Sequence, residues 1–261
     1  MTQQVACIIW SHNVAEAALS FKTLSKAPIK EALIGIKIAP AAESSLELLE
    51  KTLRHLPDDY HTPREPITLS QTQLMVGPGA PRSTNVEQKQ LGWRFGTKSG
   101  RYAVQARTDW FIFSHLAPYS TWPEFSEEAH KIWSIFGSLY SPAGIQAVSI
   151  RNLNELSLRL GENVEKYLKF YINVPQGVPQ EFRNYFARIE LLQSPDTVAT
   201  LQSGLLPPLP DCARLLLDIE LTKTIAPKNE KDLWDAVHSL REPKNQIFFS
   251  CITEEWEATL A

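Results

Sequence analysis

The chain has 261 residues, of which 43% are hydrophobic and 21% charged, and its formal net charge is −3. This size and composition are typical of a globular protein with a substantial core, in one large domain or two smaller ones. The slight negative charge argues against a protein held to nucleic acid by a broad basic surface. No stretch of the sequence approaches the ~20 apolar residues of a membrane-spanning helix.

Cysteine content and the N-terminal sequence indicate the compartment. Cys7, Cys212 and Cys251 lie far apart and form no CxxC pair, which is typical of reduced, buried thiols. The apolar stretch from Val5 to Trp10 is too short for the core of a secretory signal. We therefore expect a cytoplasmic protein without a membrane anchor.

The first part of the chain alternates loops with regular elements. Residues 1–25 are interpreted as an N-terminal extension, and residues 32–38 predict a strand because apolar residues alternate there. Leucines at helical spacing predict a helix from about Ser44. Residues 63–74 are expected to form a loop that enters another strand. Residues 76–88 are polar and rich in turn-forming residues, and so predict a mobile loop.

The aromatic residues concentrate between Trp93 and Tyr140. Residues 93–95 and 102–107 alternate around the turn at residues 98–100, which is a hairpin pattern. Residues 110–113 supply a third strand after a short connection. Three strands joined by tight turns predict an antiparallel meander.

A capped helix is predicted to follow this meander. Thr121 and Glu124 have the T-x-x-E spacing of a capping box, and Gly137 is expected to end the helix. The apolar residues of the helix recur on one face, which should pack on the meander with its aromatic side chains almost fully buried. They are Trp122, Phe125, Ala129, Ile132, Trp133 and Phe136.

The remaining sequence predicts further strands, at residues 145–153, 185–192, 197–201 and 215–225. The proline cluster at residues 207–210 is expected to separate the last two. Asn229 is expected to cap a helix that Pro243 ends, and residues 246–252 to form a final apolar strand. Thr253 should then cap a terminal helical turn.

These elements predict an α+β protein of antiparallel sheets with packed helices, possibly in two related halves, residues 26–160 and 161–261. An internal echo supports duplication. Residues 32–40 and 215–227 are both predicted strands that end in Ile-Ala-Pro and precede a helix.

Several motifs occur in a recognisable order. They are APIKEA at residues 27–32, GWRF at 92–95, LAPYSTWPEF at 116–125, RNLN at 151–154, NQIFF at 245–249 and ITE at 252–254. In these segments the chain resembles a sporadically distributed, uncharacterised bacterial family of about this length. The resemblance covers residues 26–258 and supplies no catalytic residues. Patchy occurrence of this kind implies a partner-dependent role, as in mobile or defence-related loci.

No catalytic or cofactor motif stands out in the sequence. The histidines show no metal-ligand spacing, and Gly77-Pro78-Gly79 lacks the Lys-Ser/Thr of a phosphate loop. Paired carboxylates fall at predicted helix ends or on solvated faces. We therefore expect no cofactor and no metal, and assign no catalytic residue.

The candidate partner-binding residues are basic and aromatic. Arg94, Arg101 and Arg107 lie on the predicted hairpin and alternate with aromatic residues. If the aromatic residues face the core, the arginines form an outward basic strip that could bind RNA or an acidic protein. A solvated sheet face gives the same pattern without any ligand. Trp10 and Trp256 lie near the chain ends, where a large aromatic is hard to bury, and are candidate partner anchors.

The sequence therefore favours a non-enzymatic interaction protein with another protein as its partner. Its expected setting is a bacterial multi-protein system of the defence or toxin–antitoxin type, as a component or regulator. One alternative is an RNA-binding module that uses the sheet face with Arg94 and Arg107. Another is an enzyme, such as a nuclease or hydrolase, whose site is assembled from scattered residues.

Overall fold

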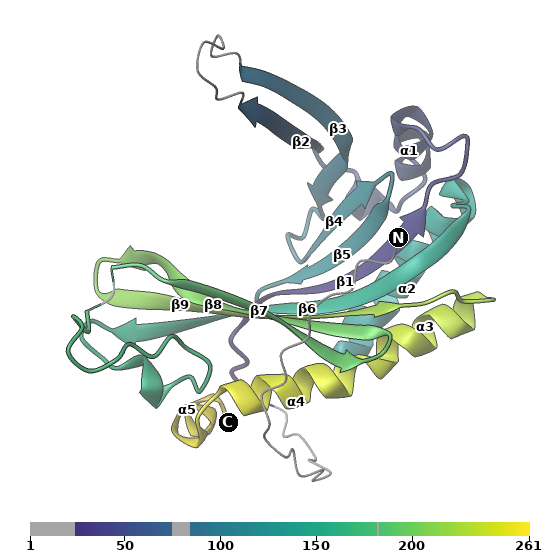
Figure 1. Cartoon of the computed structure of the whole chain (residues 1–261). Helices are drawn as coiled ribbons and strands as arrows, with labels where there is room; N and C mark the ends of the chain where they lie inside the picture. Colours follow the sequence, from purple (N-terminus) through teal and green to yellow (C-terminus); the bar gives the residue numbers. More distant parts are fainter. Residues whose placement is uncertain (1–23, 75–83, 182) are drawn as a thin grey trace.

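The computed structural model describes residues 24–74, 84–181 and 183–261. In this part of the chain, nine strands form one sheet in the order β2-β3-β4-β5-β1-β6-β9-β8-β7, and helices lie along one of its faces (Figure 1). Every neighbouring pair of strands is antiparallel. The predicted α+β class with antiparallel sheet is confirmed.

Groups of consecutive strands are separated by helices, and the last three elements of the chain are helices. The strands are β1 (Ile29–Ala39), β2 (Glu65–Leu74), β3 (Thr84–Gly96), β4 (Tyr102–Arg107), β5 (Trp110–Leu116), β6 (Gly144–Arg159), β7 (Phe186–Ser194), β8 (Thr197–Leu209) and β9 (Cys212–Thr224). The helices are α1 (Leu46–Leu53), α2 (Trp122–Tyr140), α3 (Glu230–Ser239), α4 (Arg241–Cys251) and α5 (Glu254–Leu260). None of the described helices is long and apolar enough to cross a membrane.

The strand order repeats a topological unit. β1 pairs with β5, the last strand of the meander β3-β4-β5, and β6 pairs with β9, the last strand of the meander β7-β8-β9. A helix follows each meander, α2 after β5 and α3 after β9. β1 and β6 pair with each other at the centre, with Ile34 opposite Ile150. In this repeat β1 is equivalent to β6. The similar segments at residues 32–40 and 215–227 lie in β1 and β9, which occupy different positions in the two units, so the sequence similarity does not follow the structural repeat.

Successive side chains of each strand point to opposite faces of the sheet. Ala32, Ile34, Ile36 and Ile38 of β1 are buried on the side of the helices, while Leu33 and its alternate neighbours point the other way. On the buried side Trp133 of α2 contacts Phe111 edge-on, with ring centroids 5.4 Å apart. The predicted packing of this helix on the meander is confirmed.

Two details of α2 differ from the prediction. The helix continues past Gly137 to Tyr140 and ends at Ser141, which adopts φ 48°. Gly137 instead makes room for an aromatic ring, because a Cβ there would lie 3.3 Å from the indole of Trp133. Trp122 is only half-buried, since it opens the first turn at the rim of the helix layer.

The largest error of the sequence prediction lies near the C-terminus. Residues 246–252 were expected to form a strand, but residues up to Cys251 belong to α4. Pro243 does not stop a helix. It falls in the first turn of α4, where a missing N–H costs no intrahelical hydrogen bond. A short apolar run fits a buried strand and a buried helix equally well, so periodicity alone misassigned it.

Two predicted loops also contain strand. β8 continues to Leu209 through Pro207 and Pro208, with a register shift between Leu206 and Leu209. Prolines are tolerated there because β8 pairs with β7 only as far as Gly204, which leaves this end at an edge. Residues 84–88 of the predicted mobile loop belong to β3, and residues 75–83 lie outside the described residues.

Candidate interaction surface

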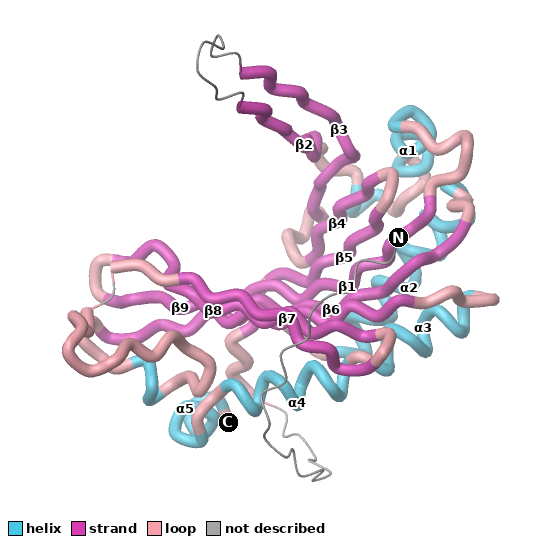
Figure 2. The backbone as a smooth tube through the Cα atoms, viewed as in Figure 1, coloured by secondary structure: helices cyan, strands magenta, loops and turns pink. Residues whose placement is uncertain are grey.

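In the part of the chain that the structure describes, no helix or loop covers the central strands on the face of the sheet opposite the helices (Figure 2). We call this surface the open face. Strand alternation and register bring a set of side chains together at its centre. They are Leu33, Gly35 and Lys37 of β1, Trp110 and Ile112 of β5, Ser149 and Arg151 of β6, and Glu220 of β9.

A glycine shapes the middle of the open face. A Cβ at Gly35 would lie 2.6 Å from Ser149 Oγ and 3.1 Å from Cζ3 of Trp110, so only glycine lets the indole lie across the strand. A small cavity of ≈130 Å³ remains beside this indole. Its walls are Leu33, Gly35, Arg107, Trp110, Ile112, Ser149, Arg151 and Glu220. The centre of the open face is therefore partly apolar and slightly hollowed.

The arginines of the open face are paired with carboxylates. Arg107 Nε lies 2.9 Å from Asp109 Oδ1, and the Arg94 guanidinium lies 3.9 Å from Glu65. The same holds for three further pairs, Arg151–Asp218, Arg188–Glu190 and Arg214–Glu155. Arg94 and Arg107 do face outward as predicted, but their counter-ions leave no basic strip.

The pair of Arg151 and Asp218 is the most deeply placed of these. Asp218 is 1% exposed, and its Oδ1 accepts from Arg151 Nε at 2.8 Å while Gln202 Nε2 donates to Oδ2 at 2.9 Å. The carboxylate raises the pKa of Arg151, and burial raises the pKa of the neighbouring Glu220. The network holds β6, β8 and β9 together beneath the open face.

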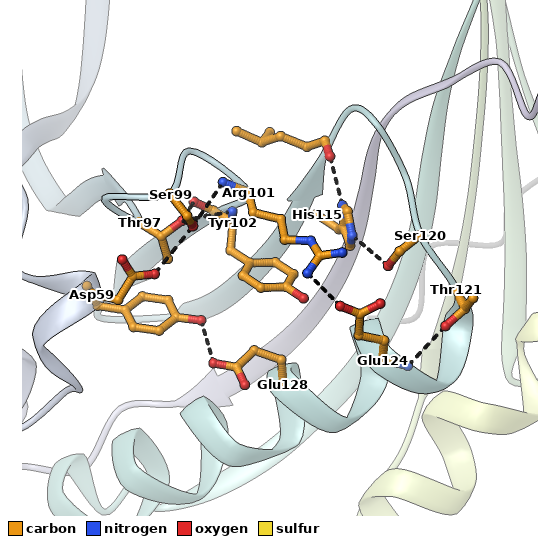
Figure 3. Close-up of polar contacts among 12 residues, drawn as sticks. Asp59, Thr97, Ser99, Arg101, Tyr102, His115, Ser120, Thr121, Glu124 and Glu128 are labelled. Atoms are coloured by element: carbon orange, nitrogen blue, oxygen red, sulfur yellow. Dashed lines mark hydrogen bonds and ion pairs between the residues drawn. The ribbon is translucent and has the colours of Figure 1, made fainter.

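Arg101 does not lie on the open face. Its guanidinium lies 2.6 Å from Glu124 Oε1 at the start of α2, with its Cζ 5.8 Å from the ring centroid of Tyr102 (Figure 3). It sits in the turn before β4, so strand alternation does not fix its direction. The three predicted arginines are therefore split between two places in the molecule.

A serine–histidine pair lies in the same polar cluster (Figure 3). His115 Nδ1 lies 2.7 Å from the Leu116 carbonyl and so carries the proton, which leaves Nε2 to accept from Ser120 Oγ at 3.0 Å. Burial lowers the pKa of His115 and keeps it neutral. The pair has the order of a base and a nucleophile. However, Ser120 lines neither the cavity of the open face nor the groove among α2, α3 and α4.

The second cavity is an open groove of ≈520 Å³ among α2, α3 and α4. Its lining is Trp122, Pro123, Ser126, Glu127, His130, His238 and Arg241. Trp122 Nε1 donates to His238 Nδ1 at 3.2 Å, and His130 Nε2 lies 3.1 Å from Glu230 Oε1, so these polar groups are already paired. Among the residues that the structure describes, no cluster of His, Cys, Asp or Glu is placed to hold a metal ion.

The two terminal tryptophans are not placed as exposed anchors. Trp256 is 7% exposed and packs against Phe248, because α5 folds back onto the protein and Thr253 caps it. Trp10 lies outside the described residues. Trp110, which the sequence placed in the third strand of the meander, points outward on the open face. Its alternation with the buried Phe111 carried the signal that it points to the other face.

Comparison with known proteins adds no identification. No family model matches the chain, and no curated protein sequence matches it.

Proposed function

We propose that this is a non-enzymatic interaction protein that binds another protein on the open face of its sheet. The observation that carries the proposal is a sheet face that no described segment covers and whose centre combines apolar side chains with paired charges. A sheet normally buries both faces against other layers, or keeps the solvent side polar. Here Trp110, Ile112 and Leu33 lie together on the uncovered side.

The chemistry of this face fits a protein surface with an apolar centre. Tryptophan and arginine are the side chains that most often dominate interface energies. Trp110, Arg107 and Arg151 line the same small cavity, and both guanidinium groups already have carboxylate partners. Such a face offers an apolar contact with polar surroundings, which resembles the core and rim of a protein interface. RNA would need several unpaired cations, whereas the arginines of this face named above each have a carboxylate partner.

The experiment is site-specific photo-crosslinking in the native host. A photoreactive phenylalanine at Ile112 should form one dominant protein adduct. The same residue at Leu139, which is 41% exposed on α2, is the matched control and should not form it. An adduct shared equally by both positions, or one removed by ribonuclease, would overturn the proposal.

A variant then tests whether the contact matters. Ile112→Glu places a charge at the centre of the open face and should abolish the adduct formed from a photoreactive residue at Leu33. Leu139→Glu should leave that adduct in place. The melting temperature of both variants should stay close to that of the parent, because Ile112 and Leu139 are only partly buried or exposed.

The wider setting of the proposal rests on the sequence. Resemblance to a patchily distributed bacterial family supports a cytoplasmic component or regulator of a multi-protein system of the defence or toxin–antitoxin type. The adduct from Ile112 identifies the partner directly. A partner encoded beside this gene supports that setting, and a partner of general metabolism contradicts it.

A further inference from the structure

Strand β7 forms an edge of the sheet. Among the residues that the structure describes it pairs only with β8, and seven of its nine residues are exposed. Large apolar side chains on both faces are among them, with Phe186 59%, Ile189 38%, Leu191 46% and Leu192 65% exposed. Natural edge strands usually carry proline, lysine or a bulge that prevents pairing with another chain. β2, the other edge, has Pro66 and mostly polar residues, whereas β7 has no proline and no lysine, and its register irregularity lies at its end, between Leu192 and Ser194.

The hydrogen-bond pattern shows which main-chain groups of β7 point outward. The amide of Leu205 on β8 donates to the carbonyl of Tyr185 at 3.1 Å. In an antiparallel pair, residues alternate between pointing their main-chain groups toward the partner and away from it. Counting from Tyr185, the N–H and C=O groups of Phe186, Arg188, Glu190 and Leu192 therefore point away from β8.

The sequence of β7 is complementary to itself in reverse. The residues with outward main-chain groups read Phe, Arg, Glu, Leu. If two copies pair antiparallel with Ile189 opposite Ile189, then Arg188 lies opposite Glu190 and Phe186 opposite Leu192, on both sides of the axis. Within one chain Arg188 Nη2 lies 2.6 Å from Glu190 Oε1, and both side chains are about half exposed, so each can also face the opposite charge of the second copy. Opposite charges and apolar groups at directly facing positions stabilise an antiparallel pair.

Of this register and the two nearest registers that keep the hydrogen bonds, only this one places opposite charges face to face. The outward main-chain groups require Arg188 to face a residue of the same set, so the register can shift only in steps of two residues. A shift one way places Arg188 opposite Arg188, and a shift the other way places Glu190 opposite Glu190. Like charges directly opposite destabilise a sheet.

We propose that β7 pairs antiparallel with β7 of a second copy of this chain, around a twofold axis at Ile189. The pairing joins two nine-stranded sheets into one. The axis runs perpendicular to the sheet, because equivalent alternate residues face the same side. Both open faces therefore lie on the same side of the dimer. The pairing uses the main-chain edge of β7. The side chains of Arg188 and Glu190 point to the same side of the sheet as the open face, but they lie at its rim, away from the central apolar side chains, and the pairing does not depend on the proposed function.

Charge reversal tests both the dimer and its register. The full chain is studied by sedimentation velocity over a concentration series, with a dissociation constant expected in the range of about micromolar, as for a small interface. Arg188→Glu alone and Glu190→Arg alone each place like charges opposite each other at both symmetric positions, and each should be monomeric. An equimolar mixture of the two variants should dimerise, because every facing pair is then opposite in charge.

The controls separate this pairing from a loss of folding and from other contacts. The double variant R188E/E190R should dimerise like the parent. Lys228→Glu, the same change of charge at an exposed site before α3, should leave the dimer unchanged. All variants should keep the melting temperature of the monomer. A parent chain that stays monomeric at about 100 µM, single variants that remain dimeric, or a mixture that stays monomeric would each overturn the proposal.

Discussion

Lys244 gives the sharpest test of the energetics of this fold. It lies in the first turn of α4, is 7% exposed, and has no ion-pair partner among the described residues. With the Asn152 amide oriented to suit its neighbours, the side-chain oxygen accepts from Lys244 Nζ at 2.7 Å. Burial, and then the charge of Arg241, lower the pKa of Lys244 from 10.5 to about 7.

Lys244→Met should stabilise the protein at neutral pH. Each unit by which the folded pKa lies below the unfolded one corresponds to about 1.4 kcal/mol, so the fall from 10.5 to about 7 costs the folded state about 5 kcal/mol. Methionine fills a similar volume without a charge. It loses the hydrogen bond to Asn152, worth about 1–2 kcal/mol with the amide left unpaired. The expected net gain is about 3–4 kcal/mol.

The gain should depend on pH in a defined way. Above pH 10.5 the amine is neutral in both states, so the penalty vanishes. Between pH 10.5 and about 7 the unfolded chain binds a proton that the folded chain does not, and the parent loses stability as the pH falls. Below about pH 7 both states are protonated and the penalty is constant.

Urea unfolding between pH 6 and 10 measures this difference. The advantage of Lys244→Met should be largest at pH 6–7 and should shrink toward pH 10. The exposed Lys228→Met is the control and should show no such trend. A Lys244→Met protein that is no more stable than the parent at pH 7, or whose advantage is the same at pH 10, would refute the reasoning.

Three further predictions concern buried groups. Trp133→Ala should lower the free energy of unfolding, measured in urea, by about 3–5 kcal/mol, because Trp133 fills the contact between α2 and the meander. A loss below about 1 kcal/mol would contradict that packing. Burial lowers the pKa of His115, so below about pH 6.5 the unfolded chain takes up a proton that the folded chain resists, and the folded state loses stability as the pH falls. His115→Gln should therefore reduce the fall in melting temperature between pH 7 and pH 5. A fall as large as that of the parent would contradict this role of His115. Asp218→Asn should lower the free energy of unfolding by about 2–4 kcal/mol, because it leaves the charge of Arg151 beside a neutral amide. Asp109→Asn, which breaks the more exposed pair with Arg107, should lower it by less than about 1 kcal/mol. Equal losses would show that burial of the pair is unimportant.

Local chemistry predicted much of the fold. Thr121, Asn229 and Thr253 each accept the main-chain hydrogen bond expected of an N-cap, and these helices begin where the sequence placed them. Capping depends on residues within one turn, so a sequence contains all of its determinants. The state of residues 246–252 depends instead on what covers them. An apolar run without a clear period can form a helix or a strand, and the tertiary packing of α4 selects the helix.

The open face was only partly predictable for the same reason. Alternation with Trp93 correctly directed Arg94 outward, but its counter-ion Glu65 comes from β2. The carboxylate that neutralises Arg151 lies on β9, far along the chain. Which strands become neighbours is a long-range property, so the sequence predicted cations where the structure has ion pairs.

The central pairing of β1 with β6 has a consequence for the order of folding. Each meander joins strands that are close in sequence, whereas the contact of Ile34 with Ile150 closes a loop that includes the whole first meander and α2. Closing so long a loop is entropically costly and slows folding, so we expect the two meanders to form before β1 and β6 meet. Ile150→Val should then accelerate unfolding while leaving the refolding rate nearly unchanged in stopped-flow experiments. A slower refolding rate would instead place the central pair in the folding nucleus.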